Sequence, residues 1–235
     1  MSGYLTKLQT IQIKDADDIQ LSMLIDNQQF YDPDGAAGKL GVCSASWPLF
    51  GLLWPSSIRL ANKISARPIR EGERILEIGC GLALASIVAH RRGMTVTASD
   101  RHPMVQTFLK KNLGLNGLPP LRYKFAQWGD NQDELAIDLG FDTLHSRFDL
   151  IMASDVLYER ETPNQLAAFI DSHANYKAEV WVVDPNRGYA GAFGRSMNEY
   201  GFNLTESRLL SSEHMLNGLG IMERYSGRFI SYARG

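Results

Sequence analysis

Ten residues decide the fold of this chain: Arg74-Ile75-Leu76-Glu77-Ile78-Gly79-Cys80-Gly81-Leu82-Ala83. The first five predict a short apolar strand. Gly79 and Gly81, one residue apart, let the backbone turn sharply and approach a ligand closely. The helix predicted after this turn would present its N-terminal amides at the same place. A plain tight turn between a strand and a helix has the same pattern, so the turn alone does not identify a ligand.

The alternation of strands and helices continues to the end of the chain. Near-continuous apolar strands joined by helices are typical of a parallel sheet that is covered on both faces. The predicted fold class is therefore α/β, and ligands are expected at the carboxyl ends of the strands, near the point where the strand order reverses. The predicted strands are 74–78, 95–99, 121–126, 148–153, 180–183, 202–209 and 228–232, and helices are predicted to begin near residues 84, 104, 162 and 189.

The N-terminal residues differ from the rest and predict an extension, 1–46, ahead of a main domain at 47–235. Residues 10–13 and 19–23 alternate apolar and polar side chains around a polar run, which predicts a β-hairpin. Residues 32–41 hold a proline and three glycines and predict a loop. The main domain starts with Trp47-Pro48 and Trp54-Pro55, and then a helix with Ile58, Ala61 and Ile64 on one face.

Composition excludes several classes of protein. The chain has 235 residues and a net charge of −2, so it lacks the basic footprint of a protein that binds nucleic acid stably. Its two cysteines, Cys43 and Cys80, form no CxxC pair, which argues against a disulfide framework or a zinc site. Residues 1–10 lack the apolar core of a signal peptide, and no apolar run reaches the roughly 18 residues of a membrane span. We expect a cytoplasmic protein that does not bind membranes.

The strand ends indicate what type of ligand binds. A dinucleotide fingerprint needs a third glycine where this chain has Leu84, and acidic Glu77 suits a cationic group better than a pyrophosphate. Asp100 ends the second strand about 20 residues after the turn, where a carboxylate can accept hydrogen bonds from both ribose hydroxyls. It could also cap the following helix. Together these residues favour a nucleoside ligand that carries positive charge.

Two more strand ends carry polar or aromatic residues. Gln127-Trp128-Gly129 follows the third strand, where an aromatic or amide group can contact an adenine ring. Ser154-Asp155-Val156-Leu157-Tyr158-Glu159 follows the fourth, fully apolar strand and lies at the expected catalytic edge. A tryptophan is more often a core residue, and polar residues after a strand can simply cap a helix, so each segment alone has a structural explanation.

Taken together, these segments resemble the seven-stranded class I methyltransferases that use S-adenosylmethionine (SAM). More closely, they are similar to methyltransferase family 16, which includes many protein-lysine methyltransferases. The resemblance covers residues 47–210. It rests on Trp54-Pro55-Ser56, the Glu77–Ala83 turn, Asp100, Asn112, Asn116, Gln127-Trp128-Gly129, Phe148-Asp149-Leu150-Ile151, the Asp155-x-x-Tyr158 signature and Asp184-Pro185-Asn186-Arg187 with Gly201-Phe202.

The resemblance implies a Rossmann-like fold with a mostly parallel seven-stranded sheet, helices on both faces and SAM as the cofactor. It implies transfer of a methyl group to a nitrogen, most simply a protein lysine, with Asp155 and Tyr158 holding the acceptor amine. Burial would help that amine to lose its proton. The cofactor-binding residues that it implies are Trp54, Glu77, Gly79, Gly81, Asp100, Gln127, Trp128, Ala153 and Ser154.

Two departures from the family pattern bear on this prediction. Ala83 stands where the third glycine of the methyltransferase turn is usual, and the first 45 residues match no motif, so the acceptor is the least determined part. The segment 154–157 lacks the Asn-Pro-Pro-Tyr pattern of enzymes that methylate planar nitrogens, which disfavours adenine, cytosine and glutamine acceptors.

Other functions remain as alternatives. A metabolite methyltransferase of the same fold needs a closed acceptor pocket, whereas a protein acceptor needs an open groove. Acidic residues at 15–18 and at 32 and 34 could attract a basic protein, although such loops are usually only solvated. A non-catalytic binding module and an NAD-dependent oxidoreductase fit less well, because the glycine turn and Asp100 are intact and no Tyr-x-x-x-Lys pair occurs. The five histidines show no metal-ligand spacing, so no metal is expected.

Overall fold

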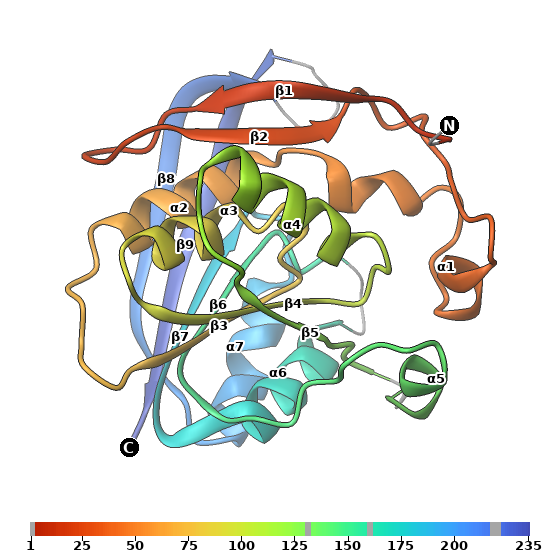
Figure 1. Cartoon of the computed structure of the whole chain (residues 1–235). Coiled ribbons are helices and arrows are strands. Elements are labelled where there is room, and N and C mark those ends of the chain that lie inside the picture. Colours follow the sequence, from red (N-terminus) through yellow and green to blue (C-terminus); the bar gives the residue numbers. More distant parts are fainter. Residues whose placement is uncertain (1–2, 130–132, 159–161, 217–221) are drawn as a thin grey trace.

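The computed structural model of the chain describes residues 3–129, 133–158, 162–216 and 222–235. Its main element is a seven-stranded sheet with the order β5-β4-β3-β6-β7-β9-β8 (Figure 1). The first five strands in this order are parallel, and β9 runs antiparallel to both of its neighbours. The strands are β3 Arg74–Ile78, β4 Thr95–Asp100, β5 Arg122–Phe125, β6 Phe148–Ser154, β7 Ala174–Asp184, β8 Asn203–Leu216 and β9 Met222–Arg234.

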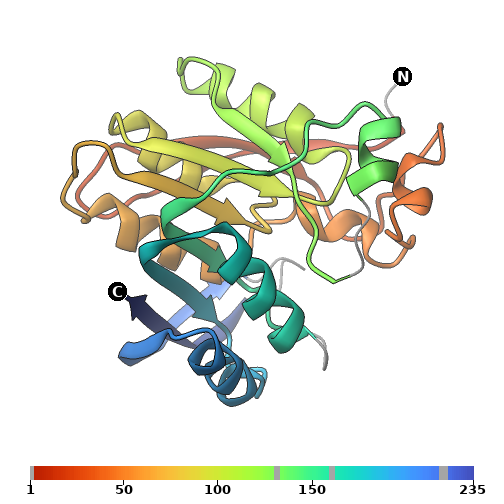
Figure 2. The same ribbon diagram turned by 90° about the horizontal axis from the view of Figure 1, so that it is seen from below.

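Helices cover both faces of this sheet (Figures 1 and 2). Neighbouring residues of one strand belong to different cores: Ile75 packs with the cluster under α2, α3 and α4, whereas Leu76 packs with the cluster under α6 and α7. Both faces of β3 are therefore buried, which explains its continuous apolar sequence. The helices are α1 Ala36–Lys39, α2 Pro55–Ser65, α3 Leu84–Arg91, α4 Val105–Leu115, α5 Asp133–Asp138, α6 Thr162–His173 and α7 Ala190–Glu199, with a 3₁₀ helix, η1, at Trp47–Gly51.

The prediction of a mostly parallel seven-stranded α/β sheet is confirmed. The structure differs at the C-terminal side, where β7 and the antiparallel β8–β9 pair are much longer than predicted. The added residues include many polar ones and are held by ladder hydrogen bonds, so they are not marked by an apolar run in the sequence. Helix α1 lies within the segment 32–41 that was predicted to be a loop, and the Asp32 carboxylate accepts hydrogen bonds from the amides of Ala37 and Gly38.

The predicted N-terminal hairpin is present as a separate two-stranded sheet, β1 Thr6–Ile11 paired with β2 Ile19–Leu24. Side chains of α4 hold the free edge of β2. Asn112 Oδ1 accepts from the Ser22 amide at 2.7 Å, and Asn116 bonds both the amide and the carbonyl of Gln20. A strand edge that would otherwise present unpaired backbone groups is thereby attached to the main domain.

Among the residues that the structure describes, none of the helices is long and apolar enough to cross a membrane.

Replacing Asn112 with alanine tests this attachment. The Ser22 amide is fully buried and would lose its acceptor, so we expect the free energy of unfolding to fall by about 1–3 kcal/mol in urea titrations. Asn116→Ala is the matched control on the next helical turn. Its bonds are partly exposed and water can replace them, so its loss should be clearly smaller. Equal losses in the two variants would contradict this account of the hairpin's anchor.

Candidate active site

The turn between β3 and α3 adopts an unusual backbone. Gly79, Gly81 and Ala83 all have positive φ, at 59°, 52° and 57°. A Cβ on Gly81 would lie 2.9 Å from the carbonyl oxygen of Phe50, and one on Gly79 would lie 2.9 Å from Val156. Glycine is therefore required at both positions by conformation and by space. Ala83, the first departure from the family pattern, adopts the left-handed conformation in spite of its methyl group.

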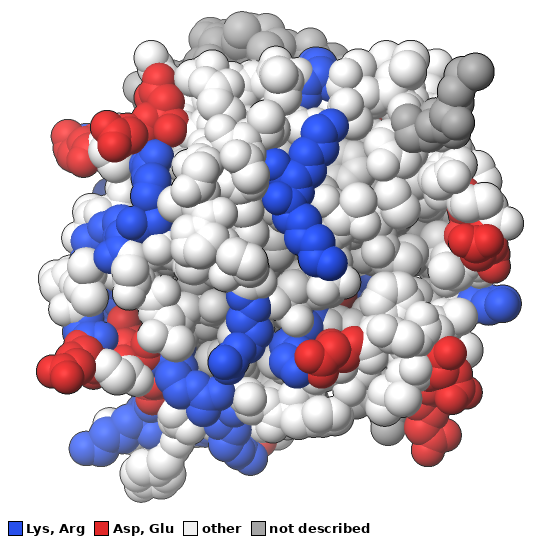
Figure 3. Space-filling model, viewed as in Figure 1, with Lys and Arg blue, Asp and Glu red and all other residues white. Residues whose placement is uncertain are grey.

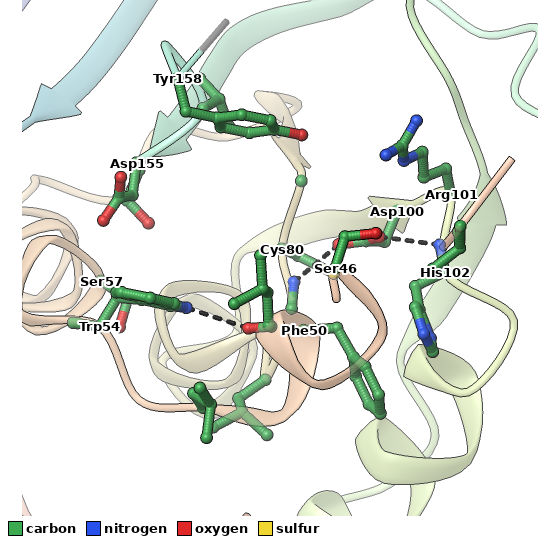
Figure 4. Close-up of a pocket in the computed structure, with 18 of the residues that line it drawn as sticks. Ser46, Phe50, Trp54, Ser57, Cys80, Asp100, Arg101, His102, Asp155 and Tyr158 are labelled. Atoms are coloured by element: carbon green, nitrogen blue, oxygen red, sulfur yellow. Dashed lines mark hydrogen bonds between the residues drawn. The ribbon is translucent and has the colours of Figure 1, made fainter. Parts of the chain in front are cut away.

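A cavity of about 430 Å³ opens at this turn, at the carboxyl ends of β3, β4 and β6 (Figure 4). That volume lies within the range of about 300–1,000 Å³ that is usual for small-molecule and cofactor sites. Eight of the predicted site residues line it. They are Trp54, Gly79, Gly81, Asp100, Trp128, Ser154, Asp155 and Tyr158.

One side of the cavity is formed by Asp100 at the end of β4. Its carboxylate accepts hydrogen bonds from the Gly81 amide at 2.9 Å and from the His102 amide at 2.9 Å (Figure 4). Burial raises the pKa of Asp100, and the hydrogen bonds to the backbone oppose that rise. Each carboxylate oxygen retains further acceptor capacity. Asp100 therefore both fixes the glycine turn and offers acceptor atoms to a ligand in the cavity.

The opposite side carries Asp155 and Tyr158, which Figure 4 shows away from Asp100. Asp155 follows β6 with φ at 58°, and its amide donates to the carbonyl of Val183 at 2.9 Å. Strained backbone of this kind persists where the surrounding structure requires it. Asp155 Oδ1 lies 2.7 Å from Arg187 Nη1. Burial raises the pKa of Asp155 to about 6, with Arg187 lowering it and Asp184 raising it.

Glu77 is a predicted cofactor residue that does not line the cavity. Its side chain points to the same face of the sheet as Ile75 and is buried at the start of α3, where Glu77 Oε2 accepts from the Ser86 amide at 2.8 Å. Burial raises its pKa to about 7, while the bond from Ser86 opposes that rise. Glu77 therefore supports the turn by satisfying a free amide at the N-terminus of α3.

Gln127 and Ala153 do not line this cavity either. Gln127 lies on a separate hollow of about 560 Å³, which Trp128 also borders. Ala153 is buried in the sheet and packs toward α6 and α7. Direct contact of Glu77, Gln127 and Ala153 with a cofactor stays a prediction.

The N-terminal extension supplies a wall of the cavity, although none of its residues was among the predicted site residues. Residues 41–43 and Ser46 line the cavity beside Phe50, which stacks on His102 with ring centroids 3.9 Å apart. Burial lowers the pKa of His102 to about 3, so this ring is neutral at physiological pH. These contacts join segments that are some fifty residues apart, and no local periodicity or motif marks them.

The acidic residues of the hairpin turn do not belong to the site. Arg91 donates to the carbonyls of Asp17 and Asp18. Figure 3 shows acidic side chains gathered over the turn between β1 and β2, at the end of the molecule opposite α1 and the cavity wall that follows it. The idea that this turn attracts a basic acceptor into the site is not supported by its position.

Comparisons with known proteins agree with this geometry. A family model described as lysine methyltransferase matches residues 50–192. The chain is 31% identical to the calmodulin-lysine N-methyltransferase of Arabidopsis thaliana, over 57% of this chain and 45% of the relative. It is 30% identical to the protein N-lysine methyltransferase METTL21A of Danio rerio, over 51% and 54%. It is 32% identical to the histone-arginine methyltransferase METTL23 of Homo sapiens, over 55% and 67%. The chain thus spans about half to two thirds of the length of these relatives.

Solved structures share the fold. A ribosomal protein L11 methylase from Lactobacillus delbrueckii subsp. bulgaricus has a TM-score of 0.57 at 17% identity, with 96% of this chain and 97% of that chain covered. SMU.776, a putative methyltransferase complexed with SAH, has a TM-score of 0.60 at 12% identity, with coverage of 96% and 56%. At these identities the similarity concerns the fold alone.

The space requirement at the turn can be tested with Gly81→Ala. Gly93→Ala is the matched control, since Gly93 also has positive φ but has open space where a Cβ would lie. The control should lose about 1–2 kcal/mol of stability from backbone strain alone. Gly81→Ala should lose measurably more in the same urea titration, because its methyl group meets the Phe50 carbonyl. Equal losses would show that conformation alone requires the glycine.

The buried carboxyl of Glu77 predicts a pH-dependent cost. Its pKa is raised in the folded protein, so the native state binds more protons than the unfolded chain between about pH 4.5 and pH 7, and stability falls as pH rises through that window. Glu77→Gln keeps an acceptor for Ser86 and removes the charge. As the pH rises from 4.5 to 8, we expect the free energy of unfolding of the variant to increase relative to that of the wild type by on the order of 3 kcal/mol.

Urea unfolding at four or five pH values would measure this difference. Glu71→Gln, at an exposed position just before β3, controls for the loss of one negative charge. Parallel stability curves for the wild type and Glu77→Gln would contradict the prediction.

Proposed function

Because the chain belongs to the lysine methyltransferase family, we propose that it is an enzyme that transfers a methyl group from SAM to the side-chain nitrogen of a protein lysine. The observation that carries the proposal is one cavity with two chemically different ends. Asp100 and the glycine turn lie at one end, and Asp155 with Tyr158 lies at the other. Such a cavity suits a nucleoside cofactor and a cationic acceptor that meet in the middle.

The residues present fit SAM. Gly79 and Gly81 bring backbone without a side chain to the cavity wall, and Asp100 offers carboxylate oxygens of the kind that bind ribose hydroxyls. Trp54 and Trp128 line the walls, and Trp54 is fixed by the hydrogen bond from its Nε1 to the Leu49 carbonyl at 3.0 Å. When bound, SAM supplies an activated methyl group on a positively charged sulfur.

The chain's own residues would then orient the acceptor and take its proton. A lysine enters as an ammonium, and the Asp155 carboxylate can hold it by a charge-assisted hydrogen bond. Asp155, with a pKa of about 6, is mostly ionised at neutral pH and close enough to neutrality to accept a proton at Oδ. The Tyr158 phenol, at the cavity rim, would align the amine. Burial of the ammonium in the cavity lowers its pKa and helps the transfer.

The state of the two cysteines agrees with the cytoplasmic location that we expect. Cys43 is exposed and Cys80 is buried, and both are free thiols. Free thiols are common in reducing environments, which supports a cytoplasmic location.

Substitution at each end should separate cofactor binding from acceptor chemistry. Asp100→Ala should weaken SAM binding by at least about tenfold in calorimetric titration, because the ribose loses its acceptors and the turn loses a support. Asp155→Asn should leave SAM binding within a few fold but lower methyl transfer by about 100-fold or more. Tyr158→Phe should show a smaller loss of transfer. If Asp155→Asn transferred methyl groups normally, Asp155 would have no role in the reaction.

The acceptor can be identified with tritiated SAM and a lysate of cells that lack this protein. Acid hydrolysis of the labelled protein fraction followed by amino-acid separation should give methyl-lysine. Label in methyl-arginine would replace the lysine proposal with the activity named for METTL23, and label only in the metabolite fraction would favour a small-molecule acceptor. Label that appears without the added protein would come from another enzyme in the lysate.

A further inference from the structure

We propose that Arg187 is a positioning residue of this site, whose guanidinium keeps the Asp155 carboxylate ionised and aimed into the cavity. The role given to Arg187 rests on the proposed function, whereas the contact between Arg187 and Asp155 is independent of it. Arg187 lies on the loop between β7 and α7, and Asp155 lies on the loop after β6. Both side chains line the same cavity, with Arg187 Nη1 2.7 Å from Asp155 Oδ1.

The burial of the two partners is unequal. The Asp155 side chain is only 10% exposed, whereas that of Arg187 is 37% exposed. A carboxylate with so little contact with water needs hydrogen-bond donors or a fixed countercharge to remain ionised. A surface ion pair of two exposed side chains would carry little weight, but here the anion is the buried partner.

The loop that bears Arg187 is fixed by a second carboxylate. Asp184, at the end of β7 and 1% exposed, accepts a hydrogen bond from the Asn186 amide at 2.8 Å. Asn186 and Gly188, which flank Arg187, both have positive φ, at 61° and 92°. This tight turn determines where Arg187 leaves the backbone. The arginine therefore leaves the chain at a position set by the turn next to Asp184.

The charges around Asp155 explain why a cation is needed there. Asp184 from β7 raises the pKa of Asp155, and Arg187 from the following loop opposes it. Tyr225 from β9 also lies in this environment, since Asp155 and Asp184 both raise its pKa, and Tyr158 follows on the same loop as Asp155. Two neighbouring carboxylates disfavour each other's ionisation. Arg187 opposes this effect at both of them, and Arg228 of β9 also lowers the pKa of Asp184. A protonated Asp155 could neither hold an ammonium nor accept its proton.

The test is a direct titration of Asp155 in the full-length protein, followed by carbon-13 NMR of aspartate carboxyl carbons. Asp155→Asn assigns the signal. In the wild type we expect a midpoint near pH 6. In Arg187→Met the midpoint should rise by about 1–3 pH units, and Arg187→Lys should restore part of the difference. Arg195→Met, the same substitution at an exposed position on α7, should leave the midpoint unchanged.

An unchanged midpoint in a folded Arg187→Met protein would overturn the proposal, and it would do so without reference to methyl transfer. Folding is checked by SAM binding or, if SAM does not bind, by circular dichroism. If Arg187→Met fails to fold, the smaller change Arg187→Gln takes its place in the same titration.

The pH dependence of methyl transfer to an acceptor protein supplies a second readout. The acidic limb of kcat/KM against pH, which reports the free enzyme, should move upward in Arg187→Met by the same amount as the NMR midpoint, so that the loss of activity shrinks at high pH. A lower KM for the acceptor with an unmoved acidic limb would also overturn the proposal, since it would show that Arg187 merely occupies the place of the acceptor's cation.

Discussion

The close approach of two backbone segments at Gly81 is the constraint on which the rest of the site depends. The carbonyl of Phe50 lies where a side chain on residue 81 would be, so the start of the main domain is packed against the turn after β3. Two carboxylates hold that turn in place. Asp100 accepts from the Gly81 amide, and Glu77 accepts from the Ser86 amide at the start of α3. Both are buried and have raised pKa values, so the preorganised turn is maintained at some expense of stability at neutral pH.

The parallel arrangement of the strands explains which parts of the site could be predicted from the sequence. Asp100 and Asp155 end apolar strands, and parallel strands that neighbour one another bring their carboxyl ends to one edge. Strand boundaries and the alternation of strands with helices are enough to predict this edge for both residues, and both line the cavity. Glu77 shows its limit. A strand boundary gives the position of a residue along the sheet, but the pleat decides which face its side chain takes. Glu77 shares the face of Ile75 and is directed to α3.

The wall formed by residues 41–43, Ser46 and Phe50 was not predicted, and the reason is different. Its members are joined to His102 and Gly81 only by long-range packing, and packing of this kind leaves no periodic or local signal. The hairpin illustrates the same point. Its strands were visible in the alternation of residues 10–23, but its docking depends on Asn112 and Asn116, whose side chains reach backbone groups some ninety residues away. These asparagines were marked by resemblance to a family, and their physical role follows from the free edge of β2.

The carboxylates at the two ends of the cavity are stabilised by different groups. At the Asp100 end, the amides of Gly81 and His102 contribute most to stabilising the carboxylate, and Arg101 adds a smaller contribution. At the Asp155 end, a second carboxylate, that of Asp184, raises the pKa of Asp155, and a guanidinium, that of Arg187, opposes it. A full countercharge lowers the affinity of Asp155 for any other cation, including an acceptor ammonium. That cost is tolerable if Asp155 has to take up a proton from the amine and not only to bind it, since a pKa of about 6 keeps the carboxylate ionised before the acceptor arrives while leaving it basic enough to receive that proton.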